Sequence, residues 1–153
     1  MVEKATVFDI DGTLVDVSKR YELCQKEAGN SKKAFWQCFL SEKYLHLDTP
    51  IEKTIKLVQK YFYEGVKVFI VTGRPKSLEK YTLIQLSTFN IFWNEIYFRG
   101  EKNFNKDYKY KSEVIQQLKE KYDILFIIDD SEEIRKVVQE KFGIKAIDPA
   151  LIS

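Results

Sequence analysis

The sequence is poor in the residues that build several common kinds of site. It has two cysteines, Cys24 and Cys38, whose spacing matches no metal or redox motif and provides no disulfide framework. We therefore expect buried thiols in a reducing compartment. The single histidine, His46, has no apparent partner, so we expect it at the surface or in packing rather than in catalysis.

Long apolar runs and targeting signals are also missing. No apolar stretch approaches the roughly 18–20 residues that a membrane span needs. The N-terminus shows no basic region followed by an apolar segment, so we expect no secretory signal, no membrane partner and a cytoplasmic location. No Gly-x-x-x-x-Gly-Lys-Ser/Thr run occurs, which excludes a P-loop kinase half. A net charge of +2 is too small to indicate a polyanion partner by itself.

The 153 residues are enough for one domain with its own core, and we expect a single domain over 1–153. Apolar, β-branched runs alternate with segments of helical periodicity. Strands are expected at 4–10, 66–71, 95–99, 124–128 and 144–147. Helices are expected at 16–29, from Asn30-Ser31 onward, after Pro50, and at 78–89, 111–121 and 132–141. This alternation predicts an α/β domain with a mostly parallel sheet of about five strands.

Residues 16–48 separate the first two strands and are expected to form a small helical insert. Its aromatic stripe, which includes Phe35 and Trp36, is more typical of a packing face than of a ligand site, although these rings could stack bases. At the end of the insert, Asp48 or Thr49 is expected to cap a helix that has Pro50 in its first turn.

Two carboxylates end the first strand. The apolar run Ala5–Ile10 ends in the carboxylates of Asp9 and Asp11, and Gly12 follows them. Aspartate is depleted inside strands, but it suits the carboxyl end of a strand, where open α/β sheets bind ligands. The spacing of two residues places both carboxylates on one side of an extended chain. A solvated acidic turn is the alternative.

Other strand ends carry polar residues that decide between these readings. Thr72-Gly73-Arg74 follows the second strand, and Asp129-Asp130 follows the most apolar one. In a parallel sheet these ends lie at one edge, so the carboxylates would repel each other unless a cation lies between them. Carboxylate oxygens are ligands that suit Mg²⁺. A metal, an anion-binding helix start and a nucleophilic carboxylate together indicate phosphoryl transfer.

The sequence resembles the haloacid dehalogenase (HAD) superfamily in four motifs. These are Asp9-Ile10-Asp11-Gly12-Thr13-Leu14, Val71-Thr72-Gly73-Arg74, a lysine that heads a helix, and Ile127-Ile128-Asp129-Asp130. The resemblance implies a Rossmann-like three-layer fold with a small helical cap at about 16–48. It also implies a Mg²⁺-dependent phosphatase.

The resemblance also implies roles for single residues. Asp9 would be the nucleophile that becomes phospho-aspartate, and Asp11 would act as acid and base, with its carboxylate left free. The phosphate group would be held by Thr72, Gly73 and a lysine. The metal would be held by Asp9, the backbone carbonyl of Asp11, Asp129 and Asp130.

Two lysines, Lys109 and Lys111, could fill the lysine position. Lys111 is followed after three and four residues by Val114 and Ile115, whereas Lys109 is followed at the same distances by Ser112 and Glu113. Only Lys111 shares an orientation with the buried face of its helix, so we predict Lys111.

Further residues resemble one branch of the superfamily, the 3′-phosphatase domain of phage-type polynucleotide kinase and its stand-alone relatives. Arg20, Arg74 and Asp107 stand where that branch has an arginine, a second arginine and an aspartate. A guanidinium suits bidentate phosphate binding, but Arg20 could equally be a structural ion-pair partner, and Asp107 could orient Lys111 or Arg74.

The resemblance thus implies a phosphatase for the terminal 3′ phosphate of a polynucleotide or nucleotide. A small insert would leave the site open, and open sites suit phosphates carried on polymers. Two alternatives remain: a nucleotidase or general small-molecule phosphatase, and a non-catalytic subunit that binds phosphate ends in a nucleic-acid repair assembly.

Overall fold

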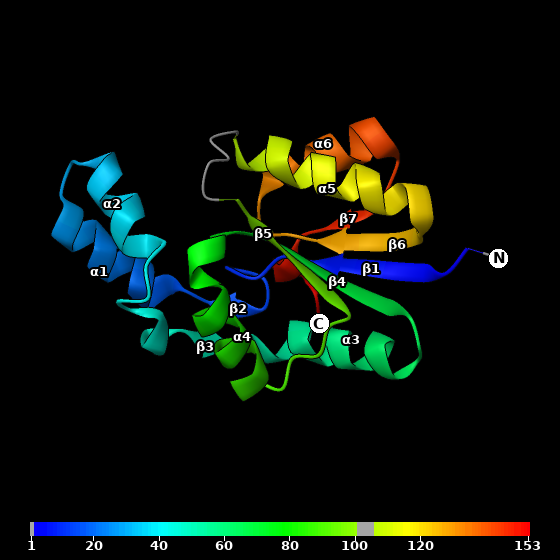
Figure 1. Cartoon of the computed structure of the whole chain (residues 1–153), viewed down its shortest axis with the longest axis horizontal. Helices are drawn as coiled ribbons and strands as arrows, with labels where there is room; N and C mark the ends of the chain where they lie inside the picture. Colours follow the sequence, from blue (N-terminus) through cyan, green and yellow to red (C-terminus); the bar gives the residue numbers. More distant parts are fainter. Residues whose placement is uncertain (1, 101–105) are drawn as a thin grey trace.

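A parallel five-stranded sheet forms the centre of the protein (Figure 1). The computed structural model describes residues 2–100 and 106–153. The strand order is β5-β4-β1-β6-β7, and every pairing in this sheet is parallel. The strands are β1 (Lys4–Phe8), β4 (Lys67–Pro75), β5 (Glu95–Arg99), β6 (Asp123–Ile128) and β7 (Ala146–Ile147). Their carboxyl ends therefore meet at one edge.

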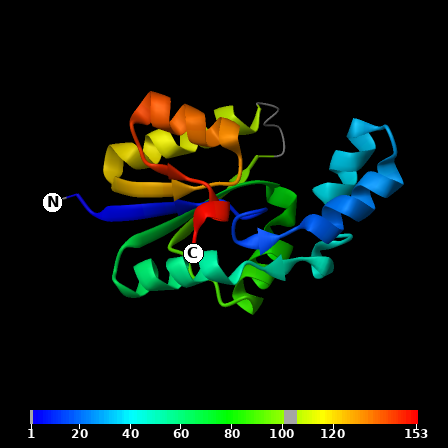
Figure 2. The same ribbon diagram turned by 180° about the vertical axis from the view of Figure 1, so that it is seen from behind.

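Helices cover both faces of the sheet (Figures 1 and 2). Helices α5 (Asp107–Lys121) and α6 (Glu132–Phe142) lie on one face, and α3 (Glu52–Tyr63) and α4 (Glu79–Thr88) lie on the other. Each face has its own buried apolar cluster, which is why β1, β4 and β6 are apolar on both sides. The α/β fold with a parallel sheet of five strands is as predicted.

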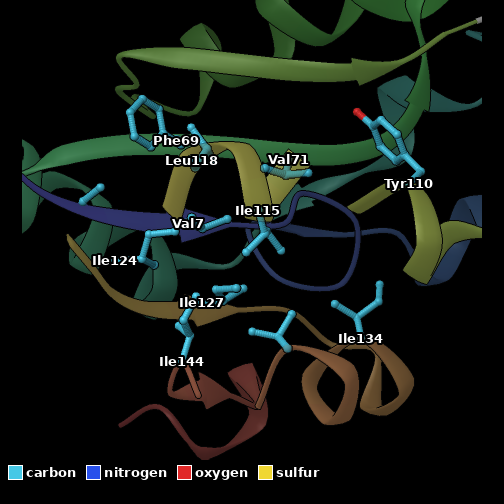
Figure 3. Packing of buried hydrophobic residues seen from close by; sticks show 12 residues of the cluster. Val7, Phe69, Val71, Tyr110, Ile115, Leu118, Ile124, Ile127, Ile134 and Ile144 are labelled. Carbon is cyan, nitrogen blue, oxygen red and sulfur yellow. The ribbon is translucent and has the colours of Figure 1, made fainter. Parts of the chain in front are cut away.

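Side chains from the three central strands and from helices α5 and α6 make up the first cluster (Figure 3). Val7 and Ile127 come from the central strands, Ile115 from α5 and Ile134 from α6. Each such aliphatic side chain contributes about 1.5–3 kcal/mol when it is fully buried. These contacts fix the beginnings of α5 and α6 near the carboxyl edge of the sheet.

Several boundaries differ from those expected. Strand β1 ends at Phe8 instead of Ile10, and β7 begins at Ala146 instead of Ile144. Helix α5 begins at Asp107 instead of Lys111, because an acidic first-turn residue interacts favourably with the helix dipole. Strand β4 continues through Thr72-Gly73-Arg74 to Pro75 instead of ending at Val71. Residues 101–105, between β5 and α5, lie outside the described residues.

A helical hairpin lies beyond the carboxyl edge of the sheet (Figure 1). It consists of α1 (Ser18–Ala28) and α2 (Lys32–Phe39) and is followed by the 3-10 turn η1 (Leu45–Leu47). The antiparallel strands β2 (Val15–Asp16) and β3 (Thr49–Pro50) form its stem. The expected helix start at Asn30-Ser31 is confirmed, since the Ser31 hydroxyl accepts a hydrogen bond from the Ala34 N–H.

Two expectations about this region are wrong. Cys24 and Cys38 form a disulfide rather than two free thiols, because the hairpin brings together positions 14 residues apart. Helix α3 begins at Glu52 after Ile51, so Pro50 lies in a strand and neither Asp48 nor Thr49 caps the helix. The aromatic stripe is a packing face, as expected, because Phe35 and Phe39 are buried in one cluster. Trp36 contacts both of these rings but is itself 53% exposed. Among the described residues, no helix is long and apolar enough to cross a membrane.

Candidate active site

The three central strands bring the predicted site residues together. Asp9 directly follows β1, Asp129 and Asp130 follow β6, and Thr72 lies near the end of β4. The order β4-β1-β6 makes these three strands neighbours. Lys111 reaches the same point from the beginning of α5, so residues that are far apart in the sequence form one cluster.

Three carboxylates form the acidic part of this cluster. Asp9, Asp129 and Asp130 each offer an oxygen, and these oxygens lie within 4.8 Å of one another. Burial raises the pKa of Asp9 well above its ordinary value, and the charge of Asp129 raises it further. Burial and Asp129 also raise the pKa of Asp130. A divalent cation fits this set, because carboxylate oxygens at close range are the ligands that Mg²⁺ prefers and because its charge would relieve their repulsion.

Lys111 supplies positive charge to the cluster. Its Nζ lies 2.8 Å from Asp9 Oδ1 and 2.8 Å from Asp129 Oδ2, and the side chain is buried. Burial alone would lower the pKa of Lys111, but the charges of Asp9 and Asp129 raise it well above its ordinary value. Lys109 is exposed, so the lysine predicted from the helix face is the one at the site.

Asp11 is held by two arginines. Its Oδ1 lies 2.8 Å from Nη2 of Arg20 and 2.7 Å from Nη2 of Arg74. The carboxylate was expected to be left free, but in the structure it pairs with both arginines. Burial acts to raise the pKa of Asp11, but the charges of Arg74 and Arg20 outweigh it and lower the pKa to about 2. Asp11 is therefore ionised at neutral pH.

Both arginines are completely buried, and neither lines the cavity described below. The Arg20 Nε donates to Asp48 Oδ1 at 3.1 Å, and Arg74 Nη1 donates to the Thr82 hydroxyl at 3.1 Å. Of the two readings of Arg20, the geometry favours the ion-pair partner over direct phosphate binding. Arg74 also pairs with Asp11 Oδ1, so the geometry favours the same role for Arg74.

Asp48 is the residue of this network that sequence reasoning missed. It is buried, its Oδ2 lies 3.1 Å from Arg20 Nη2 and 3.6 Å from Arg74 Nη2, and it accepts a hydrogen bond from Gln85. Two buried arginines thus face two aspartates. The sequence placed Asp48 at a helix start, and nothing in its local pattern indicates a contact with arginines from two other elements.

Close backbone approaches explain the two glycines of the motifs. Gly12 has φ of +81°, and a Cβ there would lie 2.1 Å from Asp130 Oδ2, so a side chain would displace a cluster carboxylate. A Cβ at Gly73 would lie 2.6 Å from Asp107 Oδ1. Asp107 Oδ2 also lies 3.7 Å from Lys111 Nζ, which favours Lys111 over Arg74 as the residue that Asp107 orients.

Hydroxyl groups and backbone N–H groups make further hydrogen bonds in the motifs. The Thr13 Oγ1 donates to Asp9 Oδ2 at 3.3 Å, and the buried Thr72 Oγ1 accepts a hydrogen bond from the Arg74 N–H at 3.0 Å. The Ser131 N–H donates to Asp129 Oδ1 at 2.9 Å, and Ser131 caps α6. Asp129 is thereby oriented by the start of a helix.

A cavity of about 1030 Å³ opens over the cluster. The carboxylates of the cluster and Lys111 lie on one side of it, and the α1–α2 hairpin lies on another. Its lining residues are Asp9, Asp11, Lys32, Trp36, Phe39, Leu40, Gly73, Arg99, Lys106, Asp107, Tyr108, Lys111, Asp129, Asp130, Ser131, Glu133 and Ile134. The cavity can admit a phosphate group together with the group that carries it.

Comparison with known families gives one match. The model of the HAD superfamily, subfamily IIIB (acid phosphatase), matches residues 2–138. No curated protein sequence matches the chain.

Solved structures share the fold at low sequence identity. The Pnkp1/Rnl/Hen1 complex matches with a TM-score of 0.76 and 20% identity over 96% of this chain and 46% of that chain. The class C acid phosphatase from Bacillus anthracis with tungstate bound matches with a TM-score of 0.66 and 17% identity over 97% and 66%. The HAD-like hydrolase SP0104 from Streptococcus pneumoniae matches with a TM-score of 0.68 and 18% identity over 95% and 84%. The chain thus spans less than half the length of the chain that it matches in the Pnkp1/Rnl/Hen1 complex.

Proposed function

Because the chain belongs to the HAD superfamily, subfamily IIIB of acid phosphatases, we propose that it is a Mg²⁺-dependent phosphomonoesterase that works through a phospho-aspartate. The observation that supports this best is the setting of Asp9, which borders the cavity while Lys111 and Thr13 hold its two oxygens. An oriented carboxylate beside a cation can attack phosphorus.

In the proposed mechanism, Asp9 forms the bond to phosphorus and the bond to the substrate oxygen breaks. Asp11, which is ionised in the resting protein, takes up a proton from solvent when the phosphate binds, gives it to that oxygen, and later takes one from the water that hydrolyses the phospho-aspartate. The negative charge of a bound phosphate raises the pKa of Asp11 from its low resting value, because like charges disfavour ionisation. Lys111 and Thr72 bind phosphate oxygens. Asp9, the Asp11 carbonyl, Asp129 and Asp130 would hold Mg²⁺, which neutralises phosphate charge when bound.

We propose the 3′ phosphate of a polynucleotide or nucleotide as the substrate, with the α1–α2 hairpin as the cap. Lys32 and the exposed Trp36 form one wall of the cavity, and Lys106 and Tyr108 lie on another. Lysines attract a phosphate backbone, and exposed aromatic rings stack on bases. One structural neighbour is titled an RNA repair complex, which agrees with such a substrate.

A nucleotidase or general acid phosphatase is the second candidate, and the acid phosphatase family match favours it. Phosphate release from an oligonucleotide with a 3′ phosphate, the same oligonucleotide with a 5′ phosphate, and a 3′ mononucleotide distinguishes the two. We expect the highest kcat/KM for the 3′-phosphorylated oligonucleotide. Equal or faster release from the mononucleotide would contradict the polynucleotide assignment.

Magnesium is expected to raise the melting temperature of the protein. At a concentration of 100 times Kd, a ligand stabilises the native state by about 2.7 kcal/mol, which corresponds to about 5–10 °C for a chain of this size. Because the pKa of Asp9 is raised, the metal competes with a proton, and the increase should shrink as the pH falls through that pKa. Differential scanning fluorimetry with and without MgCl₂, at several pH values, measures the increase in melting temperature.

Asp129→Asn provides the matched control for this measurement, since it removes one cluster carboxylate and keeps the shape of the side chain. The variant should show a much smaller increase. An unchanged increase in Asp129→Asn would place the bound ion elsewhere.

A further inference from the structure

The α1–α2 hairpin has a very small core. Its buried cluster consists of Cys24, Phe35 and Phe39, and one of these belongs to the disulfide. Helices of 11 and 8 residues are too short to be stable by themselves. The hairpin lies beyond the edge of the sheet, away from the two large cores (Figure 2). The position of the hairpin therefore depends on a few interactions. One of them is covalent, the disulfide that joins α1 to α2.

Helix α2 has two connections to the active site. The exposed side chains Lys32 and Trp36 of this helix line the cavity. At its end, the Phe39 carbonyl accepts a hydrogen bond from Arg20 Nη1 at 2.6 Å, and the Phe39 ring lies 4.3 Å from the guanidinium. Cys38 directly precedes Phe39, so the disulfide fixes the segment that carries both connections.

We propose that the Cys24–Cys38 disulfide is a redox-sensitive positioning element. In the oxidised protein it holds the α2 wall over the cavity and favours binding of a polynucleotide end, and its reduction releases that wall. The proposal rests on the proposed function for the identity of the substrate.

The chemistry is a thiol–disulfide exchange with a dithiol reductant. Cys38 is partly exposed and Cys24 is completely buried, so the reductant thiolate attacks Cys38 Sγ. The S–S bond breaks, and Cys24 leaves as a thiolate that takes up a proton. The second thiol of the reductant then attacks the mixed disulfide and releases Cys38. Two electrons pass to the protein, and the reductant becomes a cyclic disulfide.

Reduction should affect binding more than chemistry. Asp9, Lys111 and Asp129 stand on the sheet and on α5, which do not depend on the hairpin. Arg20 keeps its bonds to Asp48 and Asp11 when the contact with Phe39 loosens. A small substrate that uses only the phosphate site would therefore keep its KM, while a polymer that touches α2 would bind more weakly.

The test compares oxidised protein with protein reduced by dithiothreitol. We expect KM for a 3′-phosphorylated oligonucleotide to rise about tenfold on reduction, equivalent to about 1.4 kcal/mol of lost binding. For p-nitrophenyl phosphate, kcat and KM should change less than about twofold, because no contact with α2 is involved. The Cys24→Ser/Cys38→Ser double variant should have the same KM for the oligonucleotide as the reduced protein, and dithiothreitol should not change it.

Binding provides a readout that does not need turnover. Fluorescence anisotropy of the labelled oligonucleotide with Asp9→Asn protein should show the same loss of affinity on reduction. Three results would overturn the proposal. The first is equal affinity for the oligonucleotide in the oxidised and reduced states. The second is a rise in KM for p-nitrophenyl phosphate as large as that for the oligonucleotide, and the third is alkylation of both cysteines before reduction. Absence of phosphate release from every ester would instead overturn the proposed function, and the anisotropy result would still decide the role of the disulfide.

Discussion

Replacing Asp9 by asparagine is expected to lower phosphate release by about four to six orders of magnitude, because loss of a nucleophile removes the covalent route entirely. The amide cannot attack phosphorus, although it keeps the shape of the side chain and its position between Lys111 and Thr13. Initial rates with p-nitrophenyl phosphate and with the 3′-phosphorylated oligonucleotide measure the loss.

The same substitution should stabilise the metal-free protein. Burial and Asp129 raise the pKa of Asp9, so the folded state prefers the neutral form of this side chain. A carboxyl group whose folded pKa lies above its unfolded value contributes stability at low pH, and this contribution is lost as the pH rises through the folded pKa. The variant should therefore melt at a higher temperature than the wild type at neutral pH.

Acidic pH provides the control for that expectation. Below the unfolded pKa the wild-type carboxyl is protonated in both states, and the difference in melting temperature should disappear. An Asp9→Asn variant that retains activity would contradict the proposed nucleophile. A variant that is less stable than the wild type at neutral pH without metal would contradict the raised pKa.

Replacing Lys111 by alanine is expected to reduce both activity and stability. Removal of one partner from a buried charge group costs about 3–5 kcal/mol, and here it leaves the cluster carboxylates without the ammonium that lies 2.8 Å from two of them. Loss of a group that stabilises transition-state charge lowers kcat by about 10²–10³-fold. Urea denaturation and steady-state kinetics measure the two effects.

Lys109→Ala is the matched control, since Lys109 lies on the same helix but is exposed. Surface substitutions of this kind usually change stability by less than about 0.5 kcal/mol. We expect activity close to that of the wild type. If Lys109→Ala lost more activity than Lys111→Ala, the assignment of the phosphate-binding lysine would be wrong.

The sequence was sufficient to predict the part of the site that lies on the sheet. Asp9, Thr72 and Asp129 follow buried apolar runs, and a parallel sheet necessarily brings such strand ends together. Lys111 could be chosen because the buried face of its helix is visible in the spacing of Val114 and Ile115. These predictions rest on the local pattern of apolar and polar residues together with the geometry of a parallel sheet.

The arrangement around Asp11 could not be predicted in the same way. Arg20, Arg74 and Asp48 come from α1, β4 and the segment before β3, and their contacts depend on how the hairpin folds back. The disulfide was missed for the same reason, because the positions of Cys24 and Cys38 become informative only when α1 and α2 are known to pack against each other. Long-range contacts of single polar residues leave no periodic signal.

The position of β1 at the centre of the sheet has a consequence for the assembly of this protein during synthesis. β1 leaves the ribosome well before one of its partners, β6, which begins only at Asp123. Until then, one edge of an apolar strand remains unpaired, and such edges promote aggregation. Asp9, the proposed nucleophile, therefore meets Asp129 only after 120 further residues have been synthesised, so that activity should appear late in folding and report completion of the sheet.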